Sequence, residues 1–379
     1  MAKVVRVPIT NVYAEGDYTG QILVGPQKAP MNVLLDTGSS ALALDGNKYT
    51  PDTAQGGDKT TNLAQSDQYG DKSSWIGAVI ESTVTVGGGA QSATLAGINV
   101  AVAYEETANM FGKSDGILGL AYAPLDDAFQ MPADTWPKRY TDSQIRAGKK
   151  TTISPYLTQL AGAEVVSDRI SFYTRRSFVH EGGGGVNDPL NKGWMIVGGG
   201  EESTDLYSGN FQIVKVLADK WYNTNLKAVI VGNSQPIQVH ARGAMGSASN
   251  SIVDSGTNSL NLGPHLLELV LSKFSSAQQA QLVSSIRSQQ PVPMTNLDLN
   301  TWPDLTFVLE GDNADVSLRV SPNDYWQVDA PKVGAALAAI TEGDNGFTIL
   351  GLPLMNGYFT IFDGEADSGR GAIKFATRK

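Results

Sequence analysis

The sequence predicts a mostly antiparallel β protein built from two similar halves. Its apolar segments are short and rich in Val, Ile, Thr, Tyr and Phe, with Gly, Asp, Asn and Pro between them, as at 76–86. An apolar run ending in Asp-(Ser/Thr)-Gly-(Ser/Thr) occurs twice, within 33–40 and 251–258. Ile-Leu-Gly-Leu follows each copy, at 117–120 and 349–352, so the sequence carries the trace of two similarly built lobes.

Two helices are expected among the strands. The first runs from Pro155 to Gly162, with Ser154 as its N-cap and the glycine as its stop. The second runs from about Pro264 to Gln289. Apolar residues lie four apart along it, at Leu266, Val270 and Phe274.

Loops are expected at three polar or Gly/Pro-rich stretches, 46–65, 123–150 and 181–192. A glycine cluster near residue 200 marks the middle of the chain. We therefore expect an N-terminal lobe over 1–200 and a C-terminal lobe over 201–379.

Composition excludes several classes of function. The chain has 379 residues, 41% of them hydrophobic, which is enough for a sizeable core. A formal net charge of -10 and a pI of about 4.8 argue against nucleic-acid and anionic-membrane partners. The absence of cysteine excludes disulfides, thiol nucleophiles and zinc–thiolate sites.

The sequence also indicates where in the cell the protein is expected. No apolar stretch approaches the roughly 20 residues of a membrane span. Residues 1–8 lack the apolar region of a secretory signal. We expect a cytoplasmic protein that does not enter a membrane, or a periplasmic or secreted one if a leader has been removed.

The two Asp-turns suggest paired carboxyl groups. In each, an apolar strand leads to the aspartate and glycine allows a sharp turn just after it. Two such turns can bring Asp36 and Asp254 together, and paired carboxyls can share a proton and activate a water. One copy alone is a common hairpin signal, but two copies with the same downstream string indicate one shared site.

These strings, taken together, resemble the pepsin-type (family A1) aspartic proteases. Further matching segments cover nearly the whole chain, at 114–122, 196–200, 207–209, 221–222 and 358–363. The resemblance implies an all-β, bilobal, double-ψ β-barrel acid protease fold with a few short helices. It also implies an aspartic endopeptidase that cleaves between mainly hydrophobic residues at acidic pH, binds pepstatin-like inhibitors, is monomeric, and uses no cofactor or metal.

The resemblance assigns roles residue by residue. Asp36 and Asp254 are the expected catalytic pair, and their neighbours support them: Thr37, Gly38, Ser39, Ser255, Gly256 and Thr257. Tyr69, Gly70 and Asp71 match the tip of the substrate-covering flap, and Asp71 resembles fungal members that accept a basic side chain before the scissile bond. Subsite candidates by family position, for which apolar core is an equally good interpretation, are Phe111, Ile117 and Met355.

The chain departs from the family pattern in three ways. Ala43 stands where a tryptophan usually supports the flap tyrosine, and Trp75 is a candidate substitute. The usual three disulfides and a basic prosegment are not visible, and in lacking both the chain is most similar to bacterial pepsin homologues.

Other kinds of active site do not fit the sequence. His180, His240 and His265 lack metal-ligand spacing, and no Gly-x-Ser-x-Gly elbow surrounds Ser39 or Ser255. The alternative function is a catalytically inactive pepsin-like binding or inhibitor protein.

Overall fold

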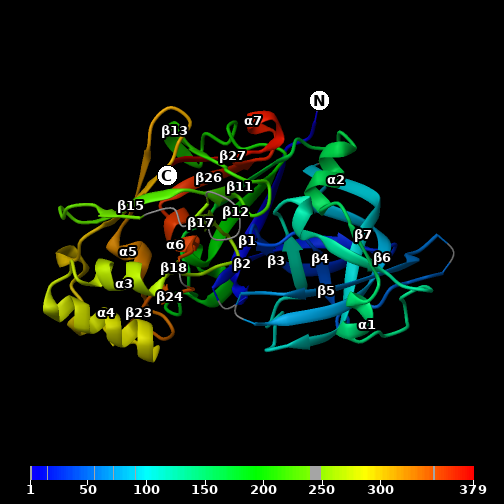
Figure 1. The fold of residues 1–379 in the computed structure, drawn as a ribbon, viewed down its shortest axis with the longest axis horizontal. Helices are drawn as coiled ribbons and strands as arrows, with labels where there is room; N and C mark the ends of the chain where they lie inside the picture. The colour runs from blue at the N-terminus through cyan, green and yellow to red at the C-terminus, as the bar shows by residue number, and fades with distance from the viewer. Residues whose placement is uncertain are drawn as a thin grey trace.

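Two β lobes share a central sheet (Figure 1). The computed structural model describes residues 2–14, 16–54, 56–70, 72–89, 91–239, 249–344 and 346–379. In Figure 1 the N-terminal lobe, blue to cyan, lies on the right, and much of the C-terminal half, yellow to orange, lies on the left. This arrangement confirms the all-β bilobal fold that the sequence predicts.

The N-terminal lobe is a closed barrel. Its strands are β2 (Asp17–Val24), β3 (Ala29–Asp36), β4 (Leu42–Asp45), β6 (Ser74–Gly88), β7 (Gln91–Thr107) and β8 (Gly116–Gly119). They are hydrogen-bonded in the order β6, β7, β4, β8, β3 and β2, and β2 pairs back onto β6. Apolar residues at alternate positions fill the interior, as the period-2 pattern predicts.

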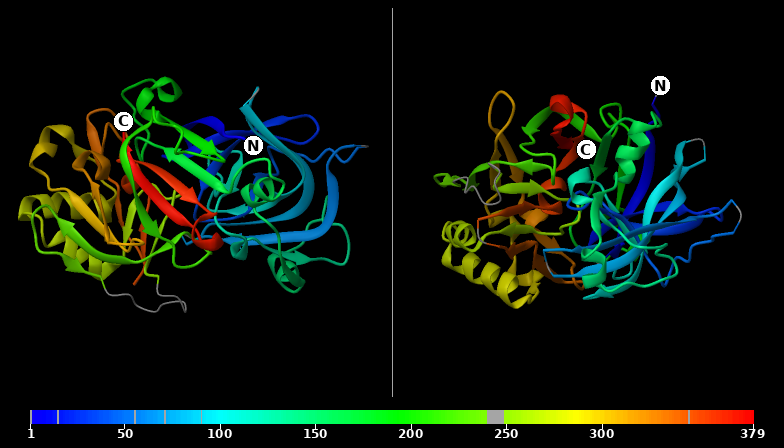
Figure 2. Two further views of the ribbon diagram at one scale, coloured as in Figure 1. Left: turned by 90° about the horizontal axis from the view of Figure 1, so that it is seen from above. Right: turned by 45° about the vertical axis from the view of Figure 1, so that its right-hand side comes forward.

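Six strands form the central sheet between the lobes. They are β1 (Val5–Ala14), β11 (Arg169–Tyr173), β12 (Lys192–Val197), β13 (Tyr207–Lys215), β26 (Tyr358–Asp363) and β27 (Ala372–Arg378). The order is β1, β12, β11, β26, β27 and β13, so the two ends of the chain enter one sheet. Figure 2 shows the red C-terminal strands crossing between the lobes in two further views.

The C-terminal lobe contains three smaller sheets. The first holds β14 (Asn223–Thr224), β17 (Ser251–Val253), β18 (Leu260–Leu262), β24 (Ile340–Glu342) and β25 (Thr348–Leu350). The second holds β15 (Leu226–Val231), β16 (Ile237–Gln238), β20 (Leu305–Leu309) and β21 (Val316–Val320). The third holds β19 (Val292–Pro293), β22 (Trp326–Val328) and β23 (Ala335–Ala338).

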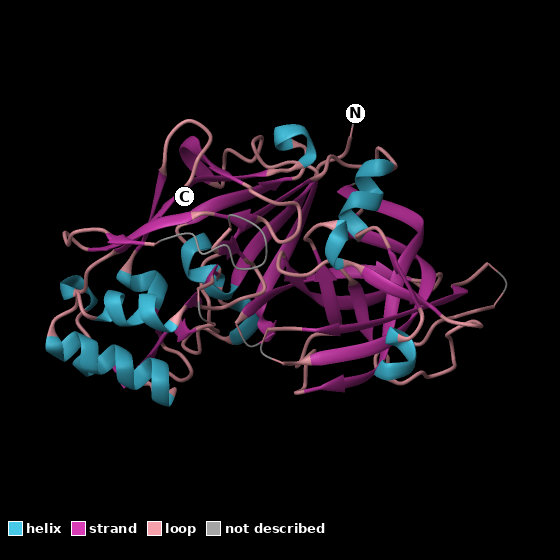
Figure 3. Ribbon diagram, in the orientation of Figure 1, coloured by secondary structure: helices cyan, strands magenta, loops and turns pink. Residues whose placement is uncertain are grey.

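The helices are short, and both of the predicted ones differ in detail. They are α1 (Asp142–Arg146), α2 (Tyr156–Gly162), α3 (Pro264–Leu271), α4 (Ser276–Ser288), α5 (Pro322–Tyr325), α6 (Leu352–Met355) and α7 (Ala366–Gly369). Pro155 itself is the N-cap of α2, so the prediction of Ser154 was wrong by one residue. Figure 3 shows α3 and α4 at the outer end of the C-terminal lobe.

The predicted single helix over 264–289 is two helices. α3 ends at Leu271 and α4 begins at Ser276. The Ser275 hydroxyl accepts from the backbone N–H of Gln278, and the Gln278 side chain accepts from the backbone N–H of Ser275. This capping box starts a new helix inside a continuous apolar pattern, which is why the spacing alone missed the break.

Two of the predicted loops contain strands. The stretch 46–65 includes the start of β5 (Lys59–Gln68), and 123–150 includes β9 (Asp127–Gln130), α1 and the start of β10 (Lys149–Thr152). β5 pairs with both β6 and β9, so tertiary pairing gives an extended structure to a polar sequence. The stretch 181–192 holds two short 3-10 turns, 185–187 and 189–191. Within the described residues, no helix is long and apolar enough to cross a membrane.

Each Ile-Leu-Gly-Leu string fits between the two strands that flank an Asp-turn. β8 pairs in parallel with β3 and antiparallel with β4, and β25 bears the same relation to β17 and β18. The glycine is needed because the chain crosses the Asp-turn there at close range. A Cβ at Gly119 would lie 2.4 Å from the Ser40 carbonyl carbon, and one at Gly351 would lie 2.1 Å from the Thr257 carbonyl oxygen.

We therefore expect Gly119→Ala to destabilise the protein. Backbone atoms crowd the position, so the new methyl group should cost about 1–3 kcal/mol of unfolding free energy. Gly162→Ala is the matched control, since nothing lies within 4 Å of the Cβ it would add. Urea unfolding of both variants measures the difference. A Gly119→Ala protein as stable as the wild type would contradict the close crossing.

Candidate active site

Asp36 and Asp254 lie at corresponding ends of two buried strands. Asp36 is the last residue of β3, and Asp254 directly follows β17. Both are buried, with 5% and 7% of their surface exposed. The structure therefore brings together the two aspartates that the repeated turns predicted.

Each turn binds its own aspartate in the same way. The Gly38 N–H donates to Asp36 Oδ1 at 2.7 Å, and the Ser39 hydroxyl donates to Asp36 Oδ2 at 2.5 Å. In the other turn, the Gly256 N–H donates to Asp254 Oδ1 at 2.9 Å and the Thr257 hydroxyl to Oδ2 at 2.8 Å. These four bonds fix the orientation of both carboxyl groups.

Reciprocal hydrogen bonds join the two turns. The Thr37 N–H donates to Ser255 Oγ at 3.0 Å, and the Ser255 N–H donates to Thr37 Oγ1 at 2.9 Å. The Ser255 hydroxyl donates on to the Leu35 carbonyl at 2.8 Å, and the Thr37 hydroxyl to the Val253 carbonyl at 3.3 Å. Each hydroxyl thus accepts from the backbone of the partner turn and donates to the strand that leads into that partner turn.

The two glycines allow the carboxyl groups to approach each other. A Cβ at Gly38 would lie 2.7 Å from Asp254 Oδ2, and one at Gly256 would lie 2.3 Å from Asp36 Oδ1. Each aspartate therefore packs against the turn that carries the other. Any side chain at either glycine would push the pair apart.

The surroundings favour a proton on the pair. Burial first, and then the neighbouring charge of Asp254, raises the pKa of Asp36 well above its ordinary value. Hydrogen bonds from Ser39 and from the Gly38 N–H favour the ionised form, but they are outweighed. The raised pKa keeps a proton on Asp36 at pH values where an ordinary aspartate is ionised.

Tyr69, the predicted flap tyrosine, lies close to Ser39 and Asp36. Tyr69 follows β5 at the tip of the β5–β6 hairpin, and the Trp75 indole N–H donates to its hydroxyl at 3.2 Å. Burial, followed by the charges of Asp67 and Asp36, raises the pKa of Tyr69 well above its ordinary value. Hydrogen bonds with Trp75 and Ser39 act in the opposite direction. The phenol therefore stays protonated next to Ser39, which itself binds Asp36.

Trp75 supports Tyr69 from a buried position. Its exposed fraction is 1%, and it packs in a cluster with Ala43, Phe111 and Ile117 under the flap. Gly70 is exposed, with open space where a Cβ would stand. Asp71 lies outside the described residues, as does His240.

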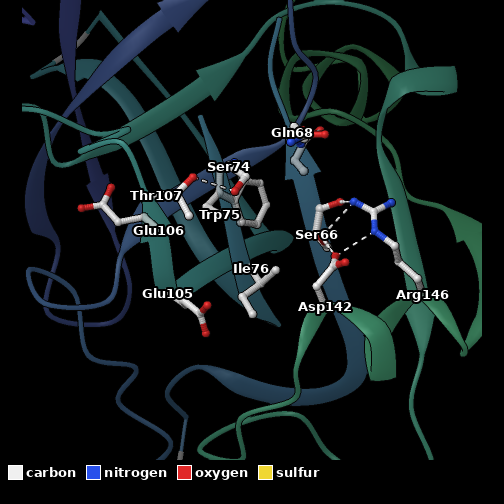
Figure 4. Close-up of a pocket in the computed structure, with 11 residues that line it drawn as sticks. Ser66, Gln68, Ser74, Trp75, Ile76, Glu105, Glu106, Thr107, Asp142 and Arg146 are labelled. Carbon is white, nitrogen blue, oxygen red and sulfur yellow. Dashed lines mark hydrogen bonds and ion pairs between the residues drawn. The ribbon is translucent and has the colours of Figure 1, made fainter. Parts of the chain in front are cut away.

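A pocket of about 410 Å³ lies beside the β5–β6 hairpin (Figure 4). Trp75 forms part of its wall, and Glu105 and Glu106 lie on one side of it in the figure. On the other side, Asp142 accepts from Arg146 at 2.7 Å. Neither catalytic candidate lines this pocket, so it is separate from the paired carboxyls.

The three subsite candidates are buried. Phe111 and Ile117 are 4% and 1% exposed and belong to the cluster around Trp75. Met355, in α6, is fully buried in the main core. Such burial favours a packing role for Met355, whereas the place of Phe111 and Ile117 under the flap is compatible with either role.

Asp17 is a third carboxyl group near the pair that sequence reasoning missed, on a half-buried residue whose Oδ1 atom is buried. Burial, then the charges of Asp254 and Asp36, raises its pKa well above the ordinary value. Its Oδ1 atom has no hydrogen-bond partner among the described residues. Asp17 begins β2, which pairs with β3, and no motif around it marks it in the sequence.

The arrangement suits hydrolysis by an activated water. Of two close carboxyls that hold one proton, the ionised one can act as general base and the protonated one can donate to an oxygen of the substrate. Two aspartates share one proton in pepsin for the same electrostatic reason. The N–H and hydroxyl donors of each turn fix both carboxyl groups, so the lone pairs that face the other carboxyl are left for this chemistry.

Comparison with known proteins agrees with this geometry. The family model described as "Eukaryotic aspartyl protease" matches residues 17–136 and 186–377. The chain is 24% identical to a vacuolar aspartic protease of Candida albicans, over 94% of this chain and 74% of the relative. It is 23% identical to rhizopuspepsin-5 of Rhizopus niveus, over 94% and 79%, and 24% identical to pepsin-2B of Gadus morhua, over 92% and 94%.

The raised pKa of Asp36 predicts a pH-dependent stability difference. Its folded pKa lies above the unfolded value, so the contribution of Asp36 to stability is present at low pH and is lost as pH rises through the folded pKa. Asp36→Asn cannot ionise. We expect the wild type to lose melting temperature relative to this variant between pH 4 and pH 7.

Thermal unfolding across that range measures the effect. The control is Asp312→Asn, which removes an exposed carboxylate, and its melting temperature should follow that of the wild type. A constant difference between wild type and Asp36→Asn at all pH values would contradict the raised pKa.

Proposed function

Because this chain belongs to the aspartyl protease family, we propose that it is an endopeptidase that hydrolyses peptide bonds with a water activated between Asp36 and Asp254. The observation that carries the proposal is the mutual packing of each aspartate against the other's turn. The intact set of hydroxyl donors, Ser39 and Thr257, favours an enzyme over an inactive binding protein.

In the proposed reaction the pair begins with one shared proton. The ionised carboxyl takes a proton from the water while the water oxygen attacks the carbonyl carbon, and the protonated carboxyl donates to the carbonyl oxygen. The tetrahedral intermediate then breaks its C–N bond. The carboxyl that took the proton from water gives it to the amine nitrogen, and the other carboxyl takes a proton back from a hydroxyl of the intermediate, so the pair again holds one proton. The reciprocal Thr37–Ser255 bonds hold the two carboxyls at constant separation through these steps.

The proposal extends to conditions and specificity. An acidic optimum is supported by the need for one proton on the pair, because that proton is lost as pH rises through the pKa of Asp36. A preference for apolar residues and sensitivity to pepstatin are supported by the family membership. A closer relation to bacterial members, suggested by the absence of cysteine, is not supported by the relatives described above, which are fungal and fish.

Cleavage of acid-denatured haemoglobin tests the activity. We expect peptide release at pH 4, inhibition by pepstatin, and at least about a thousandfold lower rate for Asp36→Ala and Asp254→Ala, since a missing member disables the pair. A wild type that binds pepstatin but cleaves no member of a peptide library between pH 3 and pH 7 would favour the inactive binding protein instead.

The Trp75–Tyr69 hydrogen bond predicts a second kinetic effect. Trp75→Phe keeps an aromatic ring in the buried cluster but removes the indole donor. Since one such bond is worth about 0.5–1.5 kcal/mol, kcat/KM should fall about three- to tenfold. Trp221→Phe, which changes a tryptophan stacked on Lys220 at 4.1 Å, should leave kcat/KM unchanged.

A double-mutant cycle distinguishes loss of the Trp75–Tyr69 hydrogen bond from a general disturbance of packing around Trp75. Tyr69→Phe removes the other partner of the same bond, so its effect and that of Trp75→Phe should not add. Fully additive losses in kcat/KM would mean that Trp75 acts by packing alone.

A further inference from the structure

A second pocket, of about 550 Å³, lies on the face of the central sheet that points away from the main core. Neighbouring residues of a strand point to opposite faces. Phe172 and Met195 pack in the main core, whereas Tyr173 and Trp194 belong to a separate small cluster on the other face. Tyr173 and Trp194 line this pocket, and neither Asp36 nor Asp254 does.

The walls of the pocket are mostly aromatic and apolar. Tyr173 is directly opposite Trp194 in the register of β11 and β12, and Pro8 of β1 is opposite Trp194 on its other side. Further apolar walls come from Ile9 and Tyr13 of β1 and from the turns that hold Val186 and Pro189. A volume of this size is within the range of small-molecule sites, roughly 300–1,000 Å³.

Two cations are the charged residues of the lining. They are Arg175 and Lys192, and neither has an ion-pair partner among the described residues. Tyr173 holds the arginine in place: its hydroxyl accepts from Arg175 Nη2 at 3.0 Å, and the guanidinium carbon lies 5.2 Å from the ring centre. No aspartate or glutamate of the described residues lines the pocket.

This charge pattern runs against the rest of the molecule. The chain has 38 acidic and 28 basic residues, so its net charge of -10 repels anions. A pocket lined by two unpaired cations and by no aspartate or glutamate of the described residues attracts anions locally. Arginine binds a carboxylate through two parallel hydrogen bonds, and an aromatic wall accommodates a flat apolar body.

We propose that this pocket binds a small carboxylate with an aromatic body, independently of the paired aspartates. The carboxylate bonds to the Arg175 guanidinium and the Lys192 ammonium. The ring of the ligand packs against Trp194 and Pro8. The site is thus a ligand site additional to the one that hydrolyses peptides.

Calorimetric titration with 4-phenylbutyrate at pH 6.5 tests the proposal. The Asp36→Asn protein is used alongside the wild type, and both should bind with equal affinity, so the result does not depend on the proposed peptidase activity. The neutral analogue 4-phenylbutan-1-ol, which lacks the carboxylate, should bind at least tenfold more weakly. Quenching of tryptophan fluorescence by 4-phenylbutyrate should be lost in Trp194→Phe.

Substitutions of Arg175 and Lys192 test whether their positive charges bind the carboxylate. Lys192→Gln changes an exposed side chain and should weaken binding about threefold or more, and Arg175→Gln with Lys192→Gln at least tenfold. Lys220→Gln is the matched control, because it removes the same charge from a lysine that lies outside the pocket. Absence of binding to the wild type, equal affinity for the alcohol, or equal affinity of the double variant and the control would each overturn the proposal.

Discussion

The contact between the two Asp-turns is the constraint on which the site depends. Thr37 and Ser255 each offer a hydroxyl that accepts from the partner turn and a backbone N–H that donates to it. Because these buried donors and acceptors are satisfied within the contact, separating the turns would leave several polar groups unpaired at a cost of about 1–3 kcal/mol each. The hydrogen bonds between Thr37 and Ser255, and not bonds of the carboxyl groups themselves, therefore hold the two carboxyl groups close together.

That geometry sets the electrostatics. Hydrogen bonds from Ser39 and Gly38 favour ionisation of Asp36, but burial and the nearby charge of Asp254 have the larger effect, so its pKa rises. Asp17 is subject to the same balance without a donor from the described residues on its Oδ1 atom. Because the pKa values of Asp36 and Asp17 are both raised, these two groups keep protons at pH values where an ordinary carboxylate has lost its own.

The sequence predicted the parts of the site that are local and repeated. Asp36 and Asp254 were found because each sits in a short string that occurs twice, and the strings fold alike. Asp17 was missed because its place beside the pair comes from the pairing of β2 with β3, which leaves no mark around it. The break before Ser275 was missed because a capping box interrupts an apolar spacing that otherwise continues. Long-range pairing also made a strand of polar residues from Lys59 onward.

The position of Trp75 follows from the volume available under the flap. Ala43 and Trp75 are both buried in one cluster, so a large side chain at position 43 would need the space that the Trp75 indole fills. The small Ala43 side chain and the large Trp75 side chain therefore fill this space together. Trp75 lies on β6, directly opposite Asp67 of β5, so it belongs to the same hairpin as Tyr69. The donor and the tyrosine thus belong to one hairpin, whereas a donor at position 43 would lie on β4 of the barrel wall. In this chain the flap carries its own support.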